Sequence, residues 1–149
     1  MATPNPAMRS FLRFHQRVYE ATGGLVGHHL IGVPCLLLHT TGRHSGQRRT
    51  VALVYARDGE RDASAGYAVV ASNHGMDAPP AWLLNLEAAA EAEIQLGRHT
   101  RKARAEVYRP GDEDYARLWQ LVNDGNHHRY ERYQAGTARP IPVVRLVPV

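Results

Sequence analysis

Residues 40–55 read TTGRHSGQRRTVALVY, and this polar turn with its apolar continuation decides the fold. The runs on either side, CLLLH over residues 35–39 and TVALVY over residues 50–55, have the length and apolar content of buried strands. Gly46 permits the positive φ angle that a tight connection between two strands requires. The sequence therefore predicts a β-hairpin that carries the polar turn at its tip.

The predicted tip is strongly basic. Arg43, His44, Arg48 and Arg49 surround the Ser45–Gly46 turn. One interpretation is a solvated surface that only keeps the protein soluble and the sheet edge from pairing. The other is an anion site, because the arginines bracket the turn and its backbone N–H groups are expected to converge beside them. The bracketing favours a site for a phosphate or a carboxylate.

Composition indicates one globular domain over residues 1–149, with a flexible tail over residues 1–6. Of the 149 residues, 44% are hydrophobic and 21% are charged, which is ordinary for a soluble protein. Cys35 is the single cysteine, so no internal disulfide and no cysteine-rich metal site is expected. The histidines lack the spacing of metal ligands, and no segment reaches the roughly 20 apolar residues of a membrane span. We expect a cytoplasmic protein without a metal.

The net charge of +4 and the pI near 9.6 predict an anionic partner. Nucleic acid is not expected, because the chain has no helix-turn-helix pattern, zinc-finger spacing or aromatic RNA-binding motif. Residues 7–21 alternate apolar and basic positions at helical spacing. This predicts a helix that packs on the domain, with weak peripheral contact to a membrane surface as the alternative.

The remaining pattern predicts an α+β fold with a mainly antiparallel sheet of about six strands, closed as a small barrel. Asp77 is expected to cap a helix that continues to about Ala92, and Pro142 indicates that the last strand lies at an edge or starts there. The other expected elements are strands at 66–72, 93–96, 101–108 and 141–149, a helix from 111 to about 122, and a broken helical segment at 127–134.

Tyr130 and Tyr133 are three residues apart and so share one face of the last helical segment. They either cover apolar core surface or border a substrate pocket, and Ser72 at a strand end is a further polar candidate. No catalytic dyad and no glycine fingerprint for a dinucleotide occurs. Any redox or transfer chemistry is therefore expected to belong to a cofactor.

Three segments, in order, resemble the deazaflavin-dependent nitroreductase family, also called F-420-dependent quinone reductases. GRHSGQRRTVALVY at 42–55 is similar to the Gly-Arg-Lys-Ser/Thr-Gly-x-x-Arg turn of that family and the strand after it. VVASNHGMDAPPAWLLNLEA at 69–88 is similar to its Ala-Ser strand end, glycine loop and Pro-x-Trp-x-x-Asn-Leu helix. HHRYERYQAGTARPIPVV at 127–144 is similar to its tyrosine-bearing segment. One departure is His44, which stands where the family usually has lysine.

The resemblance implies a split β-barrel, like that of flavin-mononucleotide-binding oxidases, that holds coenzyme F-420. This reduced 8-hydroxy-5-deazaflavin carries a phosphodiester and a polyglutamate tail, which would account for the basic turn. The implied activity is hydride transfer to a quinone, a nitro-aromatic compound or an activated alkene. A non-catalytic carrier of the coenzyme, and a split barrel that binds FMN or haem, are the alternatives. Barrels of this kind often pair, so a homodimer is also expected.

The family motifs also assign residues to roles. Tyr130, Tyr133 and Ser72 are the expected catalytic residues, with Tyr130 over the deazaflavin and Tyr133 beside the substrate. The expected cofactor-binding residues are Arg43, His44, Ser45, Arg49, Thr50, Val51, Ala52, Leu53, Val54, Val70, Ala71, Ser72, Asn73, Ala81, Trp82, Leu83, Leu84, Asn85 and Tyr130.

Overall fold

The computed structural model describes residues 29–30, 33–59 and 65–149, and the structural statements below concern this part of the chain. Two predictions fall outside it: the tail over residues 1–6 and the helix over residues 7–21.

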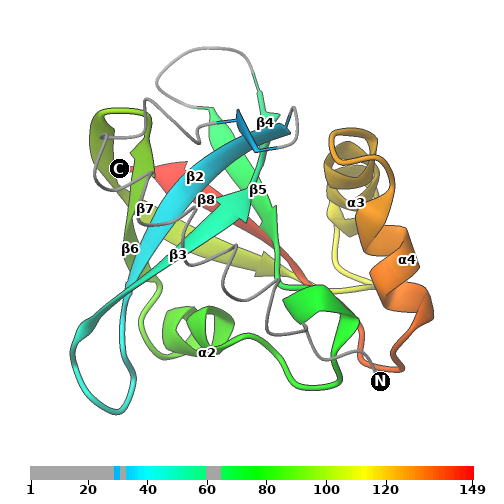
Figure 1. Cartoon of the computed structure of the whole chain (residues 1–149), viewed down its shortest axis with the longest axis horizontal. Helices are drawn as coiled ribbons and strands as arrows, with labels where there is room; N and C mark the ends of the chain where they lie inside the picture. Colours follow the sequence, from blue (N-terminus) through cyan, green and yellow to red (C-terminus); the bar gives the residue numbers. More distant parts are fainter. Residues whose placement is uncertain (1–28, 31–32, 60–64) are drawn as a thin grey trace.

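The predicted hairpin is confirmed. Strand β2 (Val33–Thr41) pairs antiparallel with β3 (Arg48–Val54), and His39 lies opposite Thr50. Gly46 has the positive φ that the sequence predicted, 70°. The Gly42 N–H donates to the Gln47 carbonyl over 2.8 Å and closes the turn. Figure 1 shows that this tip extends beyond the body of the barrel, beside α2 (Ala81–Ala88).

The strands form an antiparallel split barrel, which confirms the predicted fold class. The sheet has eight strands instead of about six, because the short strands β1 (His29–Leu30) and β4 (Ala56–Asp58) were not predicted. The others are β5 (Gly66–Val70), β6 (Glu91–Leu96), β7 (His99–Tyr108) and β8 (Val143–Pro148).

The barrel is closed by the chain connection from β3 to β4. The sheet runs β2-β6-β7-β8-β5-β4, β4 follows β3 after Tyr55, and β3 returns to β2. Within the described residues β3 pairs only with β2, so the barrel is split beside β3. Strand β8 lies between β7 and β5, so the edge position proposed for Pro142 is wrong. Pro142 directly precedes the strand, where its missing N–H costs no ladder hydrogen bond.

The helices begin and end differently from the prediction. α2 ends at Ala88 and not near Ala92, because Ala89 is extended and the chain enters β6 at Glu91 to pair with β7. Sheet pairing thus overrides the helical preference of the alanines. Asp77 does not cap α2, because the N-cap residue is Pro80. The Asp77 carboxylate instead accepts a hydrogen bond from the Thr137 hydroxyl over 2.7 Å.

A short 3-10 turn, η1 (Asn73–Gly75), connects β5 to α2, and two further helices follow β7. They are α3 (Tyr115–Asp124), which begins four residues later than the predicted start at 111, and α4 (Arg129–Ala135). Figure 1 shows α3 and α4 side by side against one flank of the barrel, with α2 at its end.

The molecule has two apolar clusters. One fills the barrel and includes Leu36, Leu38 and Val69, with Trp82 of α2 closing it. The other lies between the sheet and the pair α3 and α4, and includes Leu118 and Tyr130. The strand predicted at 101–108 is confirmed as part of β7, and Ala103, Ala105 and Val107, at alternate positions, all pack against the first cluster.

Asp58 joins α3 to the sheet through ionic hydrogen bonds. Its carboxylate accepts from the Arg117 guanidinium over 2.7 Å and 3.3 Å, and it lies 2.9 Å from Arg145 Nε. The hydrogen bond from Arg117 is the main cause that lowers the pKa of Asp58 below its ordinary value. The carboxylate therefore favours the folded state while it is ionised.

We expect Asp58→Asn to lower the free energy of unfolding by about 1–2 kcal/mol at pH 7, the size of a charged hydrogen bond lost at a partly exposed site. Because the folded pKa lies below the unfolded one, wild type loses this advantage as the pH falls below about 4. Urea unfolding of both proteins from pH 7 to pH 3 measures the gap between their free energies of unfolding. Glu113→Gln, at an exposed position in the turn before α3, is the control. A gap that does not narrow in acid would contradict the assignment.

Candidate functional site

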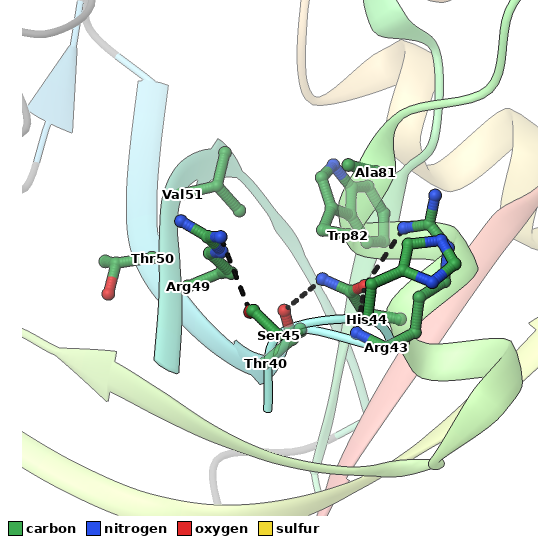
Figure 2. Close-up of a pocket in the computed structure, with 11 residues that line it drawn as sticks. Thr40, Arg43, His44, Ser45, Arg49, Thr50, Val51, Ala81 and Trp82 are labelled. Atoms are coloured by element: carbon green, nitrogen blue, oxygen red, sulfur yellow. Dashed lines mark hydrogen bonds between the residues drawn. The ribbon is translucent and has the colours of Figure 1, made fainter. Parts of the chain in front are cut away.

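A pocket of about 440 Å³ lies between the hairpin tip and the beginning of α2. This volume is in the usual range of small-molecule sites. Figure 2 shows that side chains of β2, β3, the turn and α2 surround it. The residues that line it are Thr40, Gly42, Arg43, His44, Ser45, Arg49, Thr50, Val51, Ala81, Trp82 and Asn85.

Several backbone N–H groups of the turn are engaged within the protein, which corrects part of one expectation. The Gly46 N–H donates to the Gly42 carbonyl over 2.8 Å, and the Gln47 N–H donates to Ser45 Oγ over 3.1 Å. The Arg43 N–H also has an acceptor in the protein, Asn85 Oδ1 at 3.1 Å. These three N–H groups are therefore not available to a ligand, which corrects the predicted convergence for them, and the positive charge of the site comes from its side chains.

Asn85 ties α2 to both sides of the turn. Its Oδ1 accepts from the backbone N–H and from Nη1 of Arg43, each over 3.1 Å. Its Nδ2 donates to Thr40 Oγ1 over 3.1 Å, and the residue is only 4% exposed. The sequence predicted Asn85 as a ligand contact, but three hydrogen bonds to the protein already engage its amide. In this geometry the amide fixes the Arg43 guanidinium at the pocket wall.

Arg43 and Arg49 bring positive charge that no carboxylate offsets among the described residues. In the described part of the chain, the arginines that form ion pairs are other ones. Arg48, for example, pairs with Glu93 at 3.3 Å. The Arg49 guanidinium reaches only a neutral acceptor, Ser45 Oγ, over 3.4 Å. A guanidinium in this state has donors to spare for a bound anion.

The other wall of the pocket is apolar. Val51 of β3 faces Ala81 and Trp82 of α2 across the pocket (Figure 2). The first turn of α2 holds no acidic residue that would compete with an anion for the positive end of the helix dipole. A ligand with a planar apolar part and an anionic part matches this combination.

Thr50 borders the pocket although its side chain points away from it (Figure 2). Its hydroxyl lies 2.8 Å from His39 Nδ1, which is the residue opposite it in the strand register. Thr50 therefore contributes backbone to the pocket, as expected from strand alternation.

The expected catalytic residues gather elsewhere, where η1 meets α4. The rings of Tyr130 and Tyr133 are 6.5 Å apart, and His74 lies edge-on to Tyr133 at 6.0 Å. Burial raises the pKa of Tyr130 to about 12, and a hydrogen bond with Asn126 opposes that rise. Burial also lowers the pKa of His74 below its ordinary value. At neutral pH the phenol therefore keeps its proton and the imidazole is neutral.

The structure brings together only part of the predicted site. Of the predicted cofactor contacts, those that line the pocket are Arg43, His44, Ser45, Arg49, Thr50, Val51, Ala81, Trp82 and Asn85. The others lie outside this pocket: Ala52, Leu53, Val54, Val70, Ala71, Ser72, Asn73, Leu83, Leu84 and Tyr130. Leu83 and Ala71 belong to the barrel core, and Tyr130 belongs to the second cluster.

Sequence reasoning missed Thr40, Gly42 and His74. Thr40 and Gly42 adjoin the basic turn, and the hairpin register that places Thr40 opposite Arg49 was the available signal. His74 follows Asn73 in the glycine loop, but nothing in the residue pattern showed that this loop packs against Tyr133.

The described ranges hold neither a membrane-spanning helix nor a clustered set of metal ligands. No helix there is long and apolar enough to cross a membrane. Nor does that part of the chain gather three or more histidine, cysteine, aspartate or glutamate side chains in an arrangement that suits a metal ion.

Comparison with known proteins places these features in a family. The family model described as F420H(2)-dependent quinone reductase matches residues 11–148. The F420H(2)-dependent quinone reductase Rv1261c of Mycobacterium tuberculosis (strain ATCC 25618 / H37Rv) is 47% identical over 136 residues, which cover 91% of this chain and 88% of the relative.

Solved structures agree with this placement. One described as an F420-H2 dependent reductase (FDR-A) superposes with a TM-score of 0.61 at 31% identity, over 76% of this chain and 93% of the other. Another, described as a domain-swapped dimer, superposes with a TM-score of 0.66 at 29% identity, over 93% and 98% of the two chains.

Proposed function

The chain belongs to the F420H(2)-dependent quinone reductase family, and from this membership we propose that it is an oxidoreductase that uses reduced coenzyme F420 to reduce a quinone. The observation that carries the proposal is the pair of arginines, Arg43 and Arg49, that face one pocket without a carboxylate partner in the described chain. Such a pair stabilises an anionic ligand, and the coenzyme has a phosphodiester and an acidic tail.

The residues of the pocket fit this coenzyme. Arg43, Arg49, His44 and Ser45 supply the donors for its anionic part, and Trp82 with Val51 supplies a wall for its planar ring. His44 replaces a lysine that is usual in the family, so the permanent charge at the turn rests on the arginines. When bound, the reduced deazaflavin supplies a hydride.

The protein's own contribution to the reaction is to orient the acceptor and to stabilise the negative charge that develops on its oxygen. Tyr130, Tyr133 and Ser72 remain our candidates for donating hydrogen bonds to that oxygen. Tyr130 can serve as such a donor because its phenol, whose pKa burial raises to about 12, is protonated at neutral pH as tyrosines ordinarily are. Its position in the second cluster supports an acceptor side near η1 and α4.

We propose a quinone as the acceptor class, and nitro-aromatic compounds and activated alkenes as further acceptors, because all accept a hydride at an electron-poor carbon or oxygen. A cytoplasmic location with weak contact to a membrane surface would suit a lipid-soluble quinone.

A homodimer is the expected assembly, supported by the domain-swapped relative. Light scattering at micromolar concentration should give the mass of two chains. A single-chain mass would refute the dimer.

Titration of the purified protein with reduced coenzyme F420, FMN and haem tests the function, followed by addition of menadione to the coenzyme complex. We expect saturable binding of F420 and oxidation of the coenzyme that depends on both protein and quinone. Binding without oxidation would make the protein a carrier. Binding of FMN or haem in preference to F420 would overturn the proposal.

A further inference from the structure

The loop that follows β5 has an unusual backbone. Asn73, His74 and Gly75 have consecutive positive φ angles of 45°, 56° and 77°. Side chains other than glycine rarely adopt this left-handed conformation, so the first two positions are strained. Within the loop, the Gly75 N–H donates to the Ser72 carbonyl over 2.8 Å and the Met76 N–H donates to the Asn73 carbonyl over 3.1 Å. Asn73 Nδ2 also donates to the Ala78 carbonyl over 2.8 Å, and further contacts from outside the loop hold this run of residues.

Arg139 supplies those contacts. Its guanidinium donates to the carbonyls of Ala71 (3.2 Å), Ser72 (2.9 Å) and Met76 (3.2 Å and 3.1 Å). These acceptors stand on both sides of the left-handed run. Only a planar fork of several N–H groups can reach all three carbonyls at once, which a lysine ammonium on its flexible stem cannot do.

Arg139 is itself held by the end of α4. Its N–H donates to Thr137 Oγ1 over 3.1 Å, and its carbonyl accepts from Gln134 Nε2 over 2.8 Å. The Thr137 hydroxyl in turn donates to Asp77. The connection after α4 and the loop after β5 are thus fastened to each other at several points.

The loop after β5 and helix α4 carry the residues that we propose to contact the hydride acceptor. Ser72 lies at the start of the loop, and Tyr130 and Tyr133 lie on α4. The Tyr133 carbonyl packs so closely on Gly75 that a Cβ built there would lie 2.9 Å from it. A rearranged loop would therefore move the Ser72 hydroxyl and the Tyr133 ring relative to each other.

We infer that Arg139 is a positioning residue of the reductase: by bonding three carbonyls of the 71–76 segment it holds the left-handed loop in the conformation that sets Ser72 against Tyr130 and Tyr133. The expected effect of Arg139 on kcat rests on the proposed function. Its effect on the loop conformation does not, because it concerns the protein without ligand. Arg139 acts through the backbone of the loop and needs no contact with the coenzyme or the quinone.

The test compares Arg139→Met and Arg139→Lys with Arg117→Met, a matched control that removes another multiply bonded arginine, the one between α3 and β4. Three quantities are measured: amide hydrogen exchange at Gly75 and Met76 in the free protein, direct binding of reduced F420, and kcat and KM for menadione. Equilibrium unfolding of each variant gives its stability.

We expect Arg139→Met to raise exchange at both amides at least tenfold and to lower kcat at least tenfold, with coenzyme affinity changed less than threefold. Arg139→Lys should recover only a minor part of either loss. Arg117→Met should lose stability but keep loop protection and kcat. Wild-type exchange and kcat in Arg139→Met would overturn the inference, as would a kcat loss that Arg117→Met shares. If wild type itself does not oxidise the coenzyme, the proposed function fails, and the exchange measurement still decides whether Arg139 holds the loop.

Discussion

Arg43→Ala/Arg49→Ala should lower the affinity for reduced coenzyme F420 by about two powers of ten or more. Each guanidinium faces the pocket with no carboxylate partner in the described chain, so each is expected to form a charged hydrogen bond with the anionic part of the ligand. One such bond contributes about 1.5–3 kcal/mol, and two correspond to at least about 3 kcal/mol. Fluorescence titration at constant ionic strength measures the change.

Arg98→Ala/Arg101→Ala removes the same charge from the β6–β7 hairpin, and neither residue lines the pocket. This control should bind the coenzyme within about twofold of wild type, because exposed charges at a distance are screened by salt. Because the two pocket arginines have mostly neutral protein partners, the double variant should unfold close to wild type. Equal loss of affinity in both double variants would show that the net charge of the protein, and not the pair Arg43 and Arg49 in the pocket, attracts the ligand.

Gly75→Ala is expected to cost about 2–5 kcal/mol of folding free energy. Part of the cost is the left-handed backbone, with φ at 77°, which penalises any Cβ by about 1–2 kcal/mol. The rest is steric, because the new Cβ would lie 2.9 Å from the carbonyl oxygen of Tyr133 and 3.2 Å from its Cα. Backbone atoms cannot rotate away as a flexible side chain can, so α4 or η1 must shift, at about 1–3 kcal/mol. Urea unfolding at pH 7 gives the difference.

Gly97→Ala separates the two contributions. Gly97 also has a positive φ, 60°, but no atom lies within 4 Å of a Cβ built on it. This variant should therefore show the backbone cost alone. If both alanine variants lose the same stability, the close approach of α4 to the loop is not tight in solution, and the contact would no longer support the inference about Arg139.

The parts of the molecule that sequence predicted well are those governed by local pattern. The length and apolar content of the two runs and the Gly46 turn were sufficient for the β2–β3 hairpin, and local residue pattern also placed β7. The end of α2 was predicted wrongly because its alanines favour helix, while the pairing of β6 with β7 depends on a strand that lies later in the chain.

The candidate site divides in the same way. The basic residues and the Trp82 helix came from motif positions, and the fold brings them to one pocket. The internal use of the turn amides, and the engagement of Asn85 with Arg43, depend on atomic positions that no spacing encodes. The Arg139 contacts join residues more than 60 positions apart in the sequence. They depend on how the whole chain folds, so local sequence pattern does not predict them.

The register of β3 has a consequence for which insertions and deletions this family can accept. Val51 and Leu53 pack against the barrel core, and Arg49, two positions before Val51, lines the pocket on the same side of the strand. A slip of one residue would turn all of these side chains to the opposite face. An insertion or deletion inside β3 would therefore disturb the core packing and turn position 49 away from the pocket at the same time, so selection for a stable fold also keeps this position facing the pocket. Length variation among relatives should concentrate in the segments outside this strand.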